Sequence, residues 1–318
     1  MRVAIIDDYQ DVALGLADWP DAVEVRGYQT HFASRDELVD AVRDCQILVI
    51  MRERTPFPAE LFARLPELRL LITSGMRNAS IDLAAAARAG VTVCGTGSDS
   101  KPPAELTWAL ILGLARHLTV ESGQLRGNGP WQSTVGTTLA GRTLGLLGFG
   151  KIGVAVGRVG RAFGMDVVAW SENLTEERTA AEGVRLAASK TELVRGSDVL
   201  SVHLVLSDRT RGLLGAADLA LLRPDALLIN TSRAAIVEQD ALVEALRAGQ
   251  LGGAGLDVFD QEPLPADHPF RTLPNVLATP HLGYVTDTNY QVYFAEAAAD
   301  ITAWLAGSPV RVLTRPAD

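Results

Sequence analysis

The sequence predicts an α/β protein with two domains, each built around a parallel sheet. The chain has 318 residues, about twice the length of an ordinary domain. Apolar residues make up 47% of the chain and charged residues 21%, which provides enough apolar material for two buried cores. Short aliphatic runs alternate with Ala- and Leu-rich segments of helical period, and this alternation is typical of βαβ units.

The net charge and the two cysteines limit which partners and which cellular location we expect for the protein. The net charge of -9 disfavours a protein that binds a phosphate backbone, so we expect no nucleic-acid partner. Cys45 and Cys94 are too few for a disulfide framework and lie beside apolar runs, which predicts reduced core residues. No apolar run approaches the roughly 18 residues of a membrane span, and the N-terminus is typical of a first strand rather than a signal peptide. We therefore expect a cytoplasmic protein that binds no membrane.

The first domain opens on a strand and continues through alternating helices and strands. Ser34 and Glu37 have the spacing of a capping box, which predicts a helix that runs through Arg43. Pro58 and Gly90 mark the start of one further helix and the end of another. The expected strands are residues 3–6, 47–51, 68–73 and 91–94, and the further helices are residues 58–65 and 81–88.

Residues 95–103 are rich in Gly, Ser and Pro and predict a crossing segment into the second domain. A long helix is expected over residues 104–118, and a polar stretch follows up to Gly141. A second βαβ series then begins. A last helix over residues 286–306 precedes a tail at 309–313 that could return to the first domain. The expected strands of the second series are residues 143–148, 166–170, 199–204, 226–230, 254–258 and 276–278.

The segment GFGKIG lies between a strong strand and a helix, with the spacing G-x-G-x-x-G. Gly148 permits a tight turn, Gly150 lets the backbone approach a pyrophosphate, and Gly153 lets the helix pack closely on the strand. The helix N-terminus would offer free N–H groups to that anion. An ordinary Gly-rich turn is the alternative, but the flanking strand–helix–strand order favours a dinucleotide site. The residues expected to contact the cofactor here are Gly148, Phe149, Gly150, Lys151, Ile152 and Gly153.

The ribose end of this site lacks its usual acid. The strand over residues 166–170 is followed by Ser171 and Glu172, at the place where an aspartate would bind the ribose diol and repel a 2′-phosphate. No arginine that could bind a 2′-phosphate is close in sequence, and the nearest one downstream is Arg178. The sequence therefore leaves NAD and NADP both open, and we expect NAD on the condition that Glu172 reaches the diol.

Three later stretches carry reactive side chains after apolar strand runs: Arg233 in NTSR, Glu262 in DVFDQEP and His281 in TPHLG. Because the carboxyl ends of parallel strands meet at the ligand edge of an open α/β sheet, we expect these side chains along one edge. Each alone could be structural, as a surface arginine, a loop carboxylate or a packed histidine. Three together, in this order and after such strands, favour catalysis.

With the segment HLVLSDRTRGL at residues 203–213, these motifs resemble the D-isomer-specific 2-hydroxyacid dehydrogenase family over almost the whole chain. The resemblance implies two Rossmann-like domains: a flavodoxin-like substrate-binding domain of residues 1–98 and 286–318, and an NAD(P)-binding domain of residues 99–285. It also implies an oxidoreductase that transfers a hydride between a nicotinamide cofactor and a small 2-hydroxy or 2-oxo acid of the D series. Family members pair through the cofactor domain, so the resemblance implies a homodimer.

The resemblance assigns roles to the three reactive residues. Arg233 would bind the substrate carboxylate and polarise the 2-oxo group, which suits a guanidinium fork. His281 would give a proton in ketone reduction and take one in alcohol oxidation, a task for a group that titrates near neutrality. Glu262 would hydrogen-bond His281, orient it and stabilise its protonated form. These three are the expected catalytic residues.

Other positions match family sites that border the cofactor and the substrate. His203 and Asp257 are expected on the nicotinamide side, and a structural role is the alternative for each. The pre-helical loop at residues 74–82 would hold the substrate carboxylate on backbone N–H groups, with Gly75 permitting close approach. Arg52 follows the second predicted strand, where a solvated or ion-paired loop is the alternative. The remaining expected contacts are Thr231, Ser232 and Gly283 with the cofactor and Arg52, Met76, Arg77 and Tyr284 with the substrate.

Two other functions stay open on the same fold. A dinucleotide-sensing scaffold or transcriptional corepressor can share it, although the intact set of Arg233, Glu262 and His281 favours an enzyme. In the formate dehydrogenase branch of the family a Gln pairs with the His, so Glu262 disfavours membership of that branch. The sequence has no cluster with metal-ligand spacing, and we expect no metal. Because the sequence ends shortly after the last predicted helix, we expect no C-terminal regulatory domain.

Overall fold

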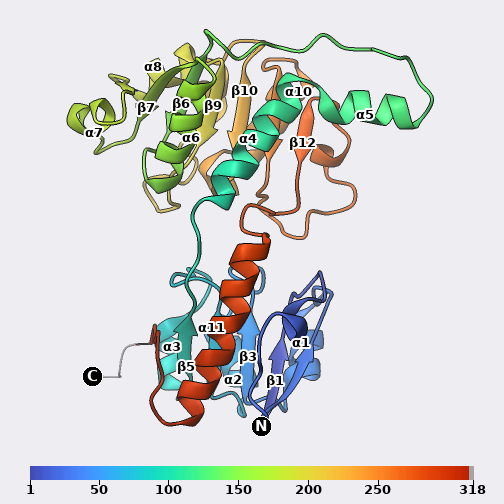
Figure 1. Ribbon diagram of the computed structural model, residues 1–318, viewed down its shortest axis with the longest axis vertical. Coiled ribbons are helices and arrows are strands. Elements are labelled where there is room, and N and C mark those ends of the chain that lie inside the picture. Colours follow the sequence, from blue (N-terminus) through green and yellow to red (C-terminus); the bar gives the residue numbers. More distant parts are fainter. Residues whose placement is uncertain (315–318) are drawn as a thin grey trace. The chain divides into compact units, whose positions relative to one another are not determined.

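The computed structural model describes residues 1–314, and the chain forms two compact units (Figure 1). Unit 1 contains Met1–Asp99 and the chain from Thr286 onward, and unit 2 is Ser100–Val285. Each unit has its own parallel sheet and its own buried core. The predicted α/β class with two Rossmann-like domains is confirmed.

Unit 1 is a five-stranded parallel sheet in the order β2-β1-β3-β4-β5, with helices on both faces. The interior strands β3 and β4 are buried at every position, as expected of strands covered on both sides. Leu48 and Leu71 pack in the core beneath α1, α2 and α3, whereas Val49 and Ile72 line a small cavity with Tyr293 of α11. The elements are β1 (Arg2–Ile5), η1 (Ala13–Gly15), β2 (Glu24–Gly27), α1 (Arg35–Val42), β3 (Ile47–Ile50), α2 (Ala59–Arg64), β4 (Leu70–Thr73), α3 (Leu83–Arg88), β5 (Thr92–Gly95) and α11 (Asp287–Leu305).

Two local predictions for unit 1 are confirmed. The Ser34 hydroxyl accepts a hydrogen bond from the Glu37 N–H at 3.2 Å, and the Glu37 carboxylate accepts one from the Ala33 N–H at 3.0 Å, as in a capping box. The C-terminal tail does return to this sheet, because the Leu313 N–H donates to the Val93 carbonyl at 2.7 Å. The tail therefore covers the exposed edge of β5.

Unit 2 is a seven-stranded parallel sheet in the order β12-β11-β10-β9-β6-β7-β8. The strand order reverses between β6 and β9, and ligands of open α/β sheets bind at such a switch point. Side chains of α8 and α10 pack in one core, and those of α4 and α6 pack in another. The elements are α4 (Pro102–Ala115), α5 (Leu118–Arg126), β6 (Thr143–Leu147), α6 (Lys151–Ala162), β7 (Asp166–Trp170), α7 (Glu176–Ala180), β8 (Arg185–Leu186), α8 (Lys190–Gly196), β9 (Val199–Val202), α9 (Ala216–Leu219), β10 (Leu227–Asn230), η2 (Ala234–Ile236), α10 (Gln239–Arg247), β11 (Gly253–Leu256), η3 (Pro269–Arg271) and β12 (Val276–Ala278).

Strands β2 and β8 and helix α5 are among the elements absent from the sequence prediction. Strands β2 and β8 lie at sheet edges, where exposed residues dilute the apolar signal. Helix α5 was taken for part of a polar stretch because none of its residues is buried. Helix α4 begins two residues earlier than predicted, since Pro102 and Pro103 fit a first helical turn, where no N–H partner is needed.

The buried cysteines agree with the sequence prediction. Cys45 and Cys94 are both free and buried, and burial raises the pKa of Cys94 to about 12. Within the described chain, no helix combines the length and apolar character needed to cross a membrane. In residues 1–314, no group of three or more His, Cys, Asp or Glu side chains could hold a metal ion.

Candidate active site and cofactor site

Unit 2 brings most of the predicted site residues to the carboxyl edge of its sheet. Each of six strands is followed closely by one of them, which is the arrangement that parallel topology imposes. The residues and the strands they follow are Gly148 after β6, Ser171 after β7, His203 after β9, Arg233 after β10, Asp257 after β11 and His281 after β12.

The three glycines of the Gly-rich loop are needed for different reasons. Gly148 has φ +105°, and a Cβ there would lie 2.7 Å from the carbonyl carbon and oxygen of His203. A Cβ on Gly153 would lie 2.3 Å from the Gly148 carbonyl oxygen. Gly150 is different, because a Cβ there would meet no atom within 4 Å. The loop is therefore packed tightly on both sides of Gly150 and open at Gly150 itself.

This open position lies at the N-terminus of α6, where Gly150 is the N-cap and no side chain caps the free N–H groups. A twelve-residue helix with uncapped N–H groups and open space in front of them fits an anionic pyrophosphate. Phe149 of the loop is buried, whereas Lys151 is exposed. The residues present thus fit a dinucleotide at the place that the sequence predicted.

An arginine from the segment after β7 reaches the Gly-rich loop. Arg178 on α7 donates a hydrogen bond from Nη2 to the Phe149 carbonyl at 3.3 Å. The chain turns back after β7, because the Leu174 N–H donates to the Ser171 carbonyl at 3.0 Å. This turn brings Arg178 to the Gly-rich loop.

His203 is partly exposed, and its Nε2 lies 2.9 Å from the Ser201 hydroxyl. Burial lowers the pKa of His203 to about 4, so the imidazole is neutral at pH 7. The backbone N–H of His203 donates to the Leu147 carbonyl at 2.8 Å, and this bond joins His203 to the strand before the Gly-rich loop. The backbone of His203 supports that loop, and a contact with the nicotinamide stays a prediction.

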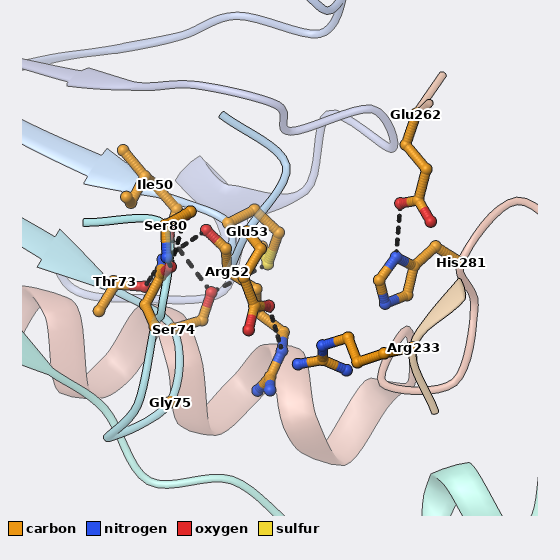
Figure 2. A network of polar contacts seen from close by, with 12 residues as sticks. Ile50, Arg52, Glu53, Thr73, Ser74, Gly75, Ser80, Arg233, Glu262 and His281 are labelled. Atoms are coloured by element: carbon orange, nitrogen blue, oxygen red, sulfur yellow. Dashed lines mark hydrogen bonds and ion pairs between the residues drawn. The ribbon is translucent and has the colours of Figure 1, made fainter. Parts of the chain in front are cut away.

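His281 and Glu262 form a close pair in unit 2. The Nδ1 atom of His281 lies 2.6 Å from the Glu262 carboxylate, and the dashed line in Figure 2 marks this contact. The other carboxylate oxygen of Glu262 accepts a hydrogen bond from the Phe259 N–H at 2.9 Å. Since a carboxylate can only accept, Nδ1 carries the proton of this bond. Nε2 of His281 has no hydrogen-bond partner within residues 1–314 and is left for chemistry.

The loop that carries His281 is held by Asp257. This carboxylate is fully buried and accepts hydrogen bonds from the Thr279 hydroxyl at 2.7 Å, the Leu282 N–H at 2.7 Å and the Gly283 N–H at 2.8 Å. Burial raises the pKa of Asp257. His281 lies between these anchors with φ +54°, a left-handed backbone that an anchored loop can maintain. Asp257 thus positions the histidine, and its contact with the nicotinamide carboxamide stays a prediction.

Arg233 lies in a turn that hydrogen bonds of the Asn230 side chain hold together. The Asn230 side chain accepts a hydrogen bond from the Ser232 N–H at 3.0 Å and donates one to the Arg233 carbonyl at 3.0 Å. The Arg233 guanidinium donates from Nη1 to the Ser232 carbonyl at 2.8 Å. The hydroxyl of Thr231 lies 2.8 Å from that of Thr107. Sequence reasoning missed Asn230, although a buried amide at a strand end is a signal for such a bracket.

Tyr284 packs against His281. Its ring meets the His281 ring edge-on, with 5.4 Å between centroids, and its side chain is buried. This packing restricts the orientation of the imidazole. A role at the edge of the substrate pocket stays a prediction.

In unit 1, Gly75 and Arg52 lie together at the ends of β4 and β3 (Figure 2). Gly75 has φ +89°, and a Cβ there would lie 2.8 Å from Nη1 of Arg52. The Gly75 N–H is already used, since it donates to the Thr96 hydroxyl at 3.0 Å. The N–H groups of Met76 and Arg77 have no acceptor within residues 1–314, so they are among the donors this loop offers.

Asn78 was missed by sequence reasoning and shapes this loop. Its amide donates to the Arg52 carbonyl at 2.7 Å and to the Thr73 hydroxyl at 3.0 Å, and its oxygen accepts from the Ser80 N–H at 2.9 Å. One side chain therefore joins the end of β3 to the loop after β4. The Arg52 Nε lies 3.7 Å from Glu53, which is the ion-paired arrangement considered as its alternative.

Comparison with known proteins gives one consistent result. The family model described as "D-isomer specific 2-hydroxyacid dehydrogenase, NAD binding domain" matches residues 108–283. A glyoxylate reductase of Aeropyrum pernix is 38% identical over 258 residues, covering 78% of this chain and 76% of the relative. A D-3-phosphoglycerate dehydrogenase of Methanocaldococcus jannaschii is 31% identical over 290 residues, covering 90% of this chain and 54% of that longer protein. The crystal structure of a phosphoglycerate oxidoreductase from Vibrio cholerae superposes with a TM-score of 0.92 at 37% identity, covering 97% of this chain and 100% of the other.

Proposed function

The chain belongs to the D-isomer-specific 2-hydroxyacid dehydrogenase family, and from this we propose that it reduces a small 2-oxo acid, or oxidises the D-2-hydroxy acid, with a nicotinamide cofactor. The observation that carries the proposal is the 2.6 Å pair of His281 and Glu262, on the same sheet edge as Arg233 and the open helix N-terminus at Gly150. An acid–base pair, a carboxylate-binding fork and a dinucleotide cradle are the parts that such a reaction needs.

When bound, the nicotinamide supplies the hydride for reduction and accepts it in oxidation. Arg233 binds the substrate carboxylate and polarises the 2-oxo group toward attack. His281 gives its Nε2 proton to the oxygen that becomes an alkoxide, and takes the proton back in the reverse direction. Glu262, at 2.6 Å from Nδ1, stabilises the imidazolium that exists before this transfer.

The cofactor contacts follow from the same edge of the sheet. We place the pyrophosphate over the α6 N-terminus, where Gly150 leaves room. The adenosine end lies toward Ser171 and Glu172, beyond the end of β7. The residues assigned to the nicotinamide end are His203, Thr231, Ser232, Asp257 and Gly283, and those assigned to the phosphates are Gly148, Phe149, Lys151, Ile152 and Gly153.

For unit 1 we propose the substrate-binding role. Since the Gly75 N–H is occupied by Thr96, the substrate carboxylate would take the N–H groups of Met76 and Arg77. The guanidinium of Arg52, held over Gly75, adds a positive charge to the same loop. Tyr284 is assigned to the edge of the substrate pocket.

A panel of 2-oxo acids tests the function. Purified protein is assayed with NADH and NADPH on pyruvate, glyoxylate, hydroxypyruvate, 2-ketoisocaproate and phenylpyruvate. We expect cofactor oxidation with at least one of them, and we expect the product to be the D isomer of the 2-hydroxy acid. If no acid supports oxidation while the dinucleotide still binds, the dinucleotide-sensing scaffold becomes the better explanation.

Glu262→Gln should lower kcat for 2-oxo acid reduction by about 10- to 100-fold. Gln keeps the size of the side chain and its oxygen can still accept from the Phe259 N–H, but its NH2 group then faces Nδ1 of His281 and can only donate. What it loses is the negative charge that stabilises the imidazolium. Steady-state kcat at saturating cofactor measures the effect, and a variant with wild-type kcat would remove Glu262 from the catalytic pair.

We further propose that the protein is a cytoplasmic homodimer. Helix α5 and the segment after it expose large apolar side chains, among them Leu125 (60% exposed), Trp131 (81%) and Val135 (92%). Sedimentation at micromolar concentration should show a species of twice 33.9 kDa. Trp131→Asp combined with Val135→Asp should shift it toward the monomer, and a wild-type protein that sediments only as a monomer would contradict the proposal.

A further inference from the structure

We propose that the C-terminal tail, residues 311–314, and Glu296 of α11 are positioning residues for the loop of residues 75–77 (the substrate loop). The inference rests on the proposed substrate-binding role of Met76 and Arg77 and adds the residues that hold them in place. The tail therefore contributes to substrate affinity, besides covering the edge of β5. All the contacts that carry the inference lie within unit 1.

The tail pairs with β5 in the antiparallel sense and runs back to it from α11 (Figure 1). The Gly95 N–H donates to the Arg311 carbonyl at 3.1 Å, and the Leu313 N–H donates to the Val93 carbonyl at 2.7 Å. The Leu313 side chain also packs against the core of the unit. The tail thus has both backbone and side-chain attachments to the strand.

Arg311 fastens the tail to α11. Its guanidinium forms an ion pair with Asp300 at 2.9 Å and donates from Nη2 to the Glu296 carbonyl at 2.9 Å. The Asp300 carboxylate is fully buried, so this cation compensates a charge that would otherwise be costly. Arg311 has φ +51°, a left-handed backbone that non-glycine residues rarely adopt, and the buried ion pair can maintain it.

Gly95 is the place where the tail meets the substrate loop. A Cβ on this glycine would lie 3.2 Å from the Leu313 side chain. The same Cβ would lie 2.6 Å from the Gly75 carbonyl oxygen and 3.2 Å from the Met76 Cα. The tail, β5 and the substrate loop therefore adjoin one another around a space too small for a methyl group.

Glu296 makes a second link between the tail and the loop. Its Oε2 atom accepts a hydrogen bond from the Gly97 N–H at 2.6 Å and lies 3.6 Å from Nε of Arg311. Gly97 follows Thr96, whose hydroxyl accepts from the Gly75 N–H at 3.0 Å. One carboxylate therefore joins the tail to the segment that holds the substrate loop.

The loop depends on such contacts at its ends because Met76 and Arg77 are themselves exposed. Asn78 anchors one end through its hydrogen bonds to the ends of β3 and β4. The tail, Gly95 and Glu296 support the other end. Hydrogen bonds to a carboxylate require donors within a narrow range of distance and angle, so a displaced loop binds the substrate less well.

Gly95→Ala tests the contact with the loop while leaving the tail intact. The new Cβ displaces the Gly75 carbonyl, so KM should rise about tenfold for glyoxylate and every other acid of the panel that the wild type reduces. Both kcat and the dissociation constant of the dinucleotide should stay within about threefold. The matched control is Gly15→Ala in the same unit, where a Cβ would meet no atom within 4 Å and KM should not change.

Arg311→Asn combined with Asp300→Asn tests the tail itself. Asparagine tolerates the left-handed backbone of residue 311, and replacing both partners leaves no unpaired buried carboxylate. We expect the same rise in KM. Hydrogen exchange of the Gly75 amide should also become about tenfold faster, a readout that needs no substrate.

Three results would contradict the inference. If exchange at Gly75 becomes faster or the melting temperature falls while KM stays at the wild-type value in both variants, the tail serves stability alone. If neither exchange nor KM changes, the tail does not support the loop. If the wild type reduces none of the acids, the proposed function fails, and the substrate role of the loop fails with it.

Discussion

Replacing His281 by asparagine should lower kcat by roughly 10²–10⁴-fold, the usual contribution of a general acid–base. Asparagine is chosen because His281 has φ +54°, and asparagine tolerates this left-handed backbone better than alanine does. The loop held by Asp257 should then keep its shape while the proton donor is removed. The dissociation constant of the cofactor should change little, since the proposed pyrophosphate site lies after β6 and the substitution leaves the backbone of the His281 loop in place.

His117→Asn is a matched control for that experiment. His117 also has a left-handed backbone, with φ +49°, and its side chain makes no hydrogen bond within the described chain. The same substitution at the same kind of backbone position should leave kcat near the wild-type value. Near wild-type turnover of His281→Asn at neutral pH would show that another group transfers the proton.

The buried strands and the strand-end positions of the proposed catalytic residues were predictable because both depend on local signals. Buried parallel strands are continuous apolar runs, and the topology carries whatever follows them to one edge. Arg233 and His281 follow such runs within a few residues, so their positions at the edge followed directly. The same argument predicted the Gly-rich loop, whose tight contacts at Gly148 and Gly153 the structure confirms.

The parts that escaped prediction depend on contacts between residues distant in sequence. Arg178 reaches the Gly-rich loop only because a turn after β7 reverses the chain, and sequence separation cannot show that. The Thr96 hydroxyl, at the end of the neighbouring strand, accepts from the Gly75 N–H, so the available donors of this loop begin at the next residue. Such contacts between loops determine which groups of a site are available to a ligand, whereas the pattern of apolar runs in the sequence determines at which sheet edge the site lies.

Asn230 and Asp257 illustrate a related limit. Both are buried polar side chains that immediately follow or end a strand, and both bracket the loop that carries a reactive residue. From sequence alone, a buried acid beside the site is indistinguishable from a residue that touches the ligand. The structure shows three hydrogen bonds to Asp257, all from the loop that carries His281, which makes positioning its observed role.

Arg233→Lys should lower kcat/KM for the 2-oxo acid by roughly 10²–10³-fold, although the charge is retained. Lysine has no planar fork, so it cannot bind the carboxylate and the 2-oxo oxygen together, nor keep the anchor from Nη1 to the Ser232 carbonyl. Loss of that geometry should raise KM and lower kcat together, because the same contact positions the substrate and polarises it.

Arg195→Lys, on the exposed face of α8, is the matched control for the same exchange and should leave both constants unchanged. Calorimetry with the dinucleotide completes the comparison, because Arg233→Lys should bind it as the wild type does. If Arg233→Lys keeps wild-type kcat/KM, the guanidinium fork makes no contact with the substrate, and the bracket formed by Asn230 would then serve only the local turn. A loss confined to dinucleotide affinity would instead move Arg233 from the substrate to the cofactor, which distinguishes the two roles that this sheet edge allows.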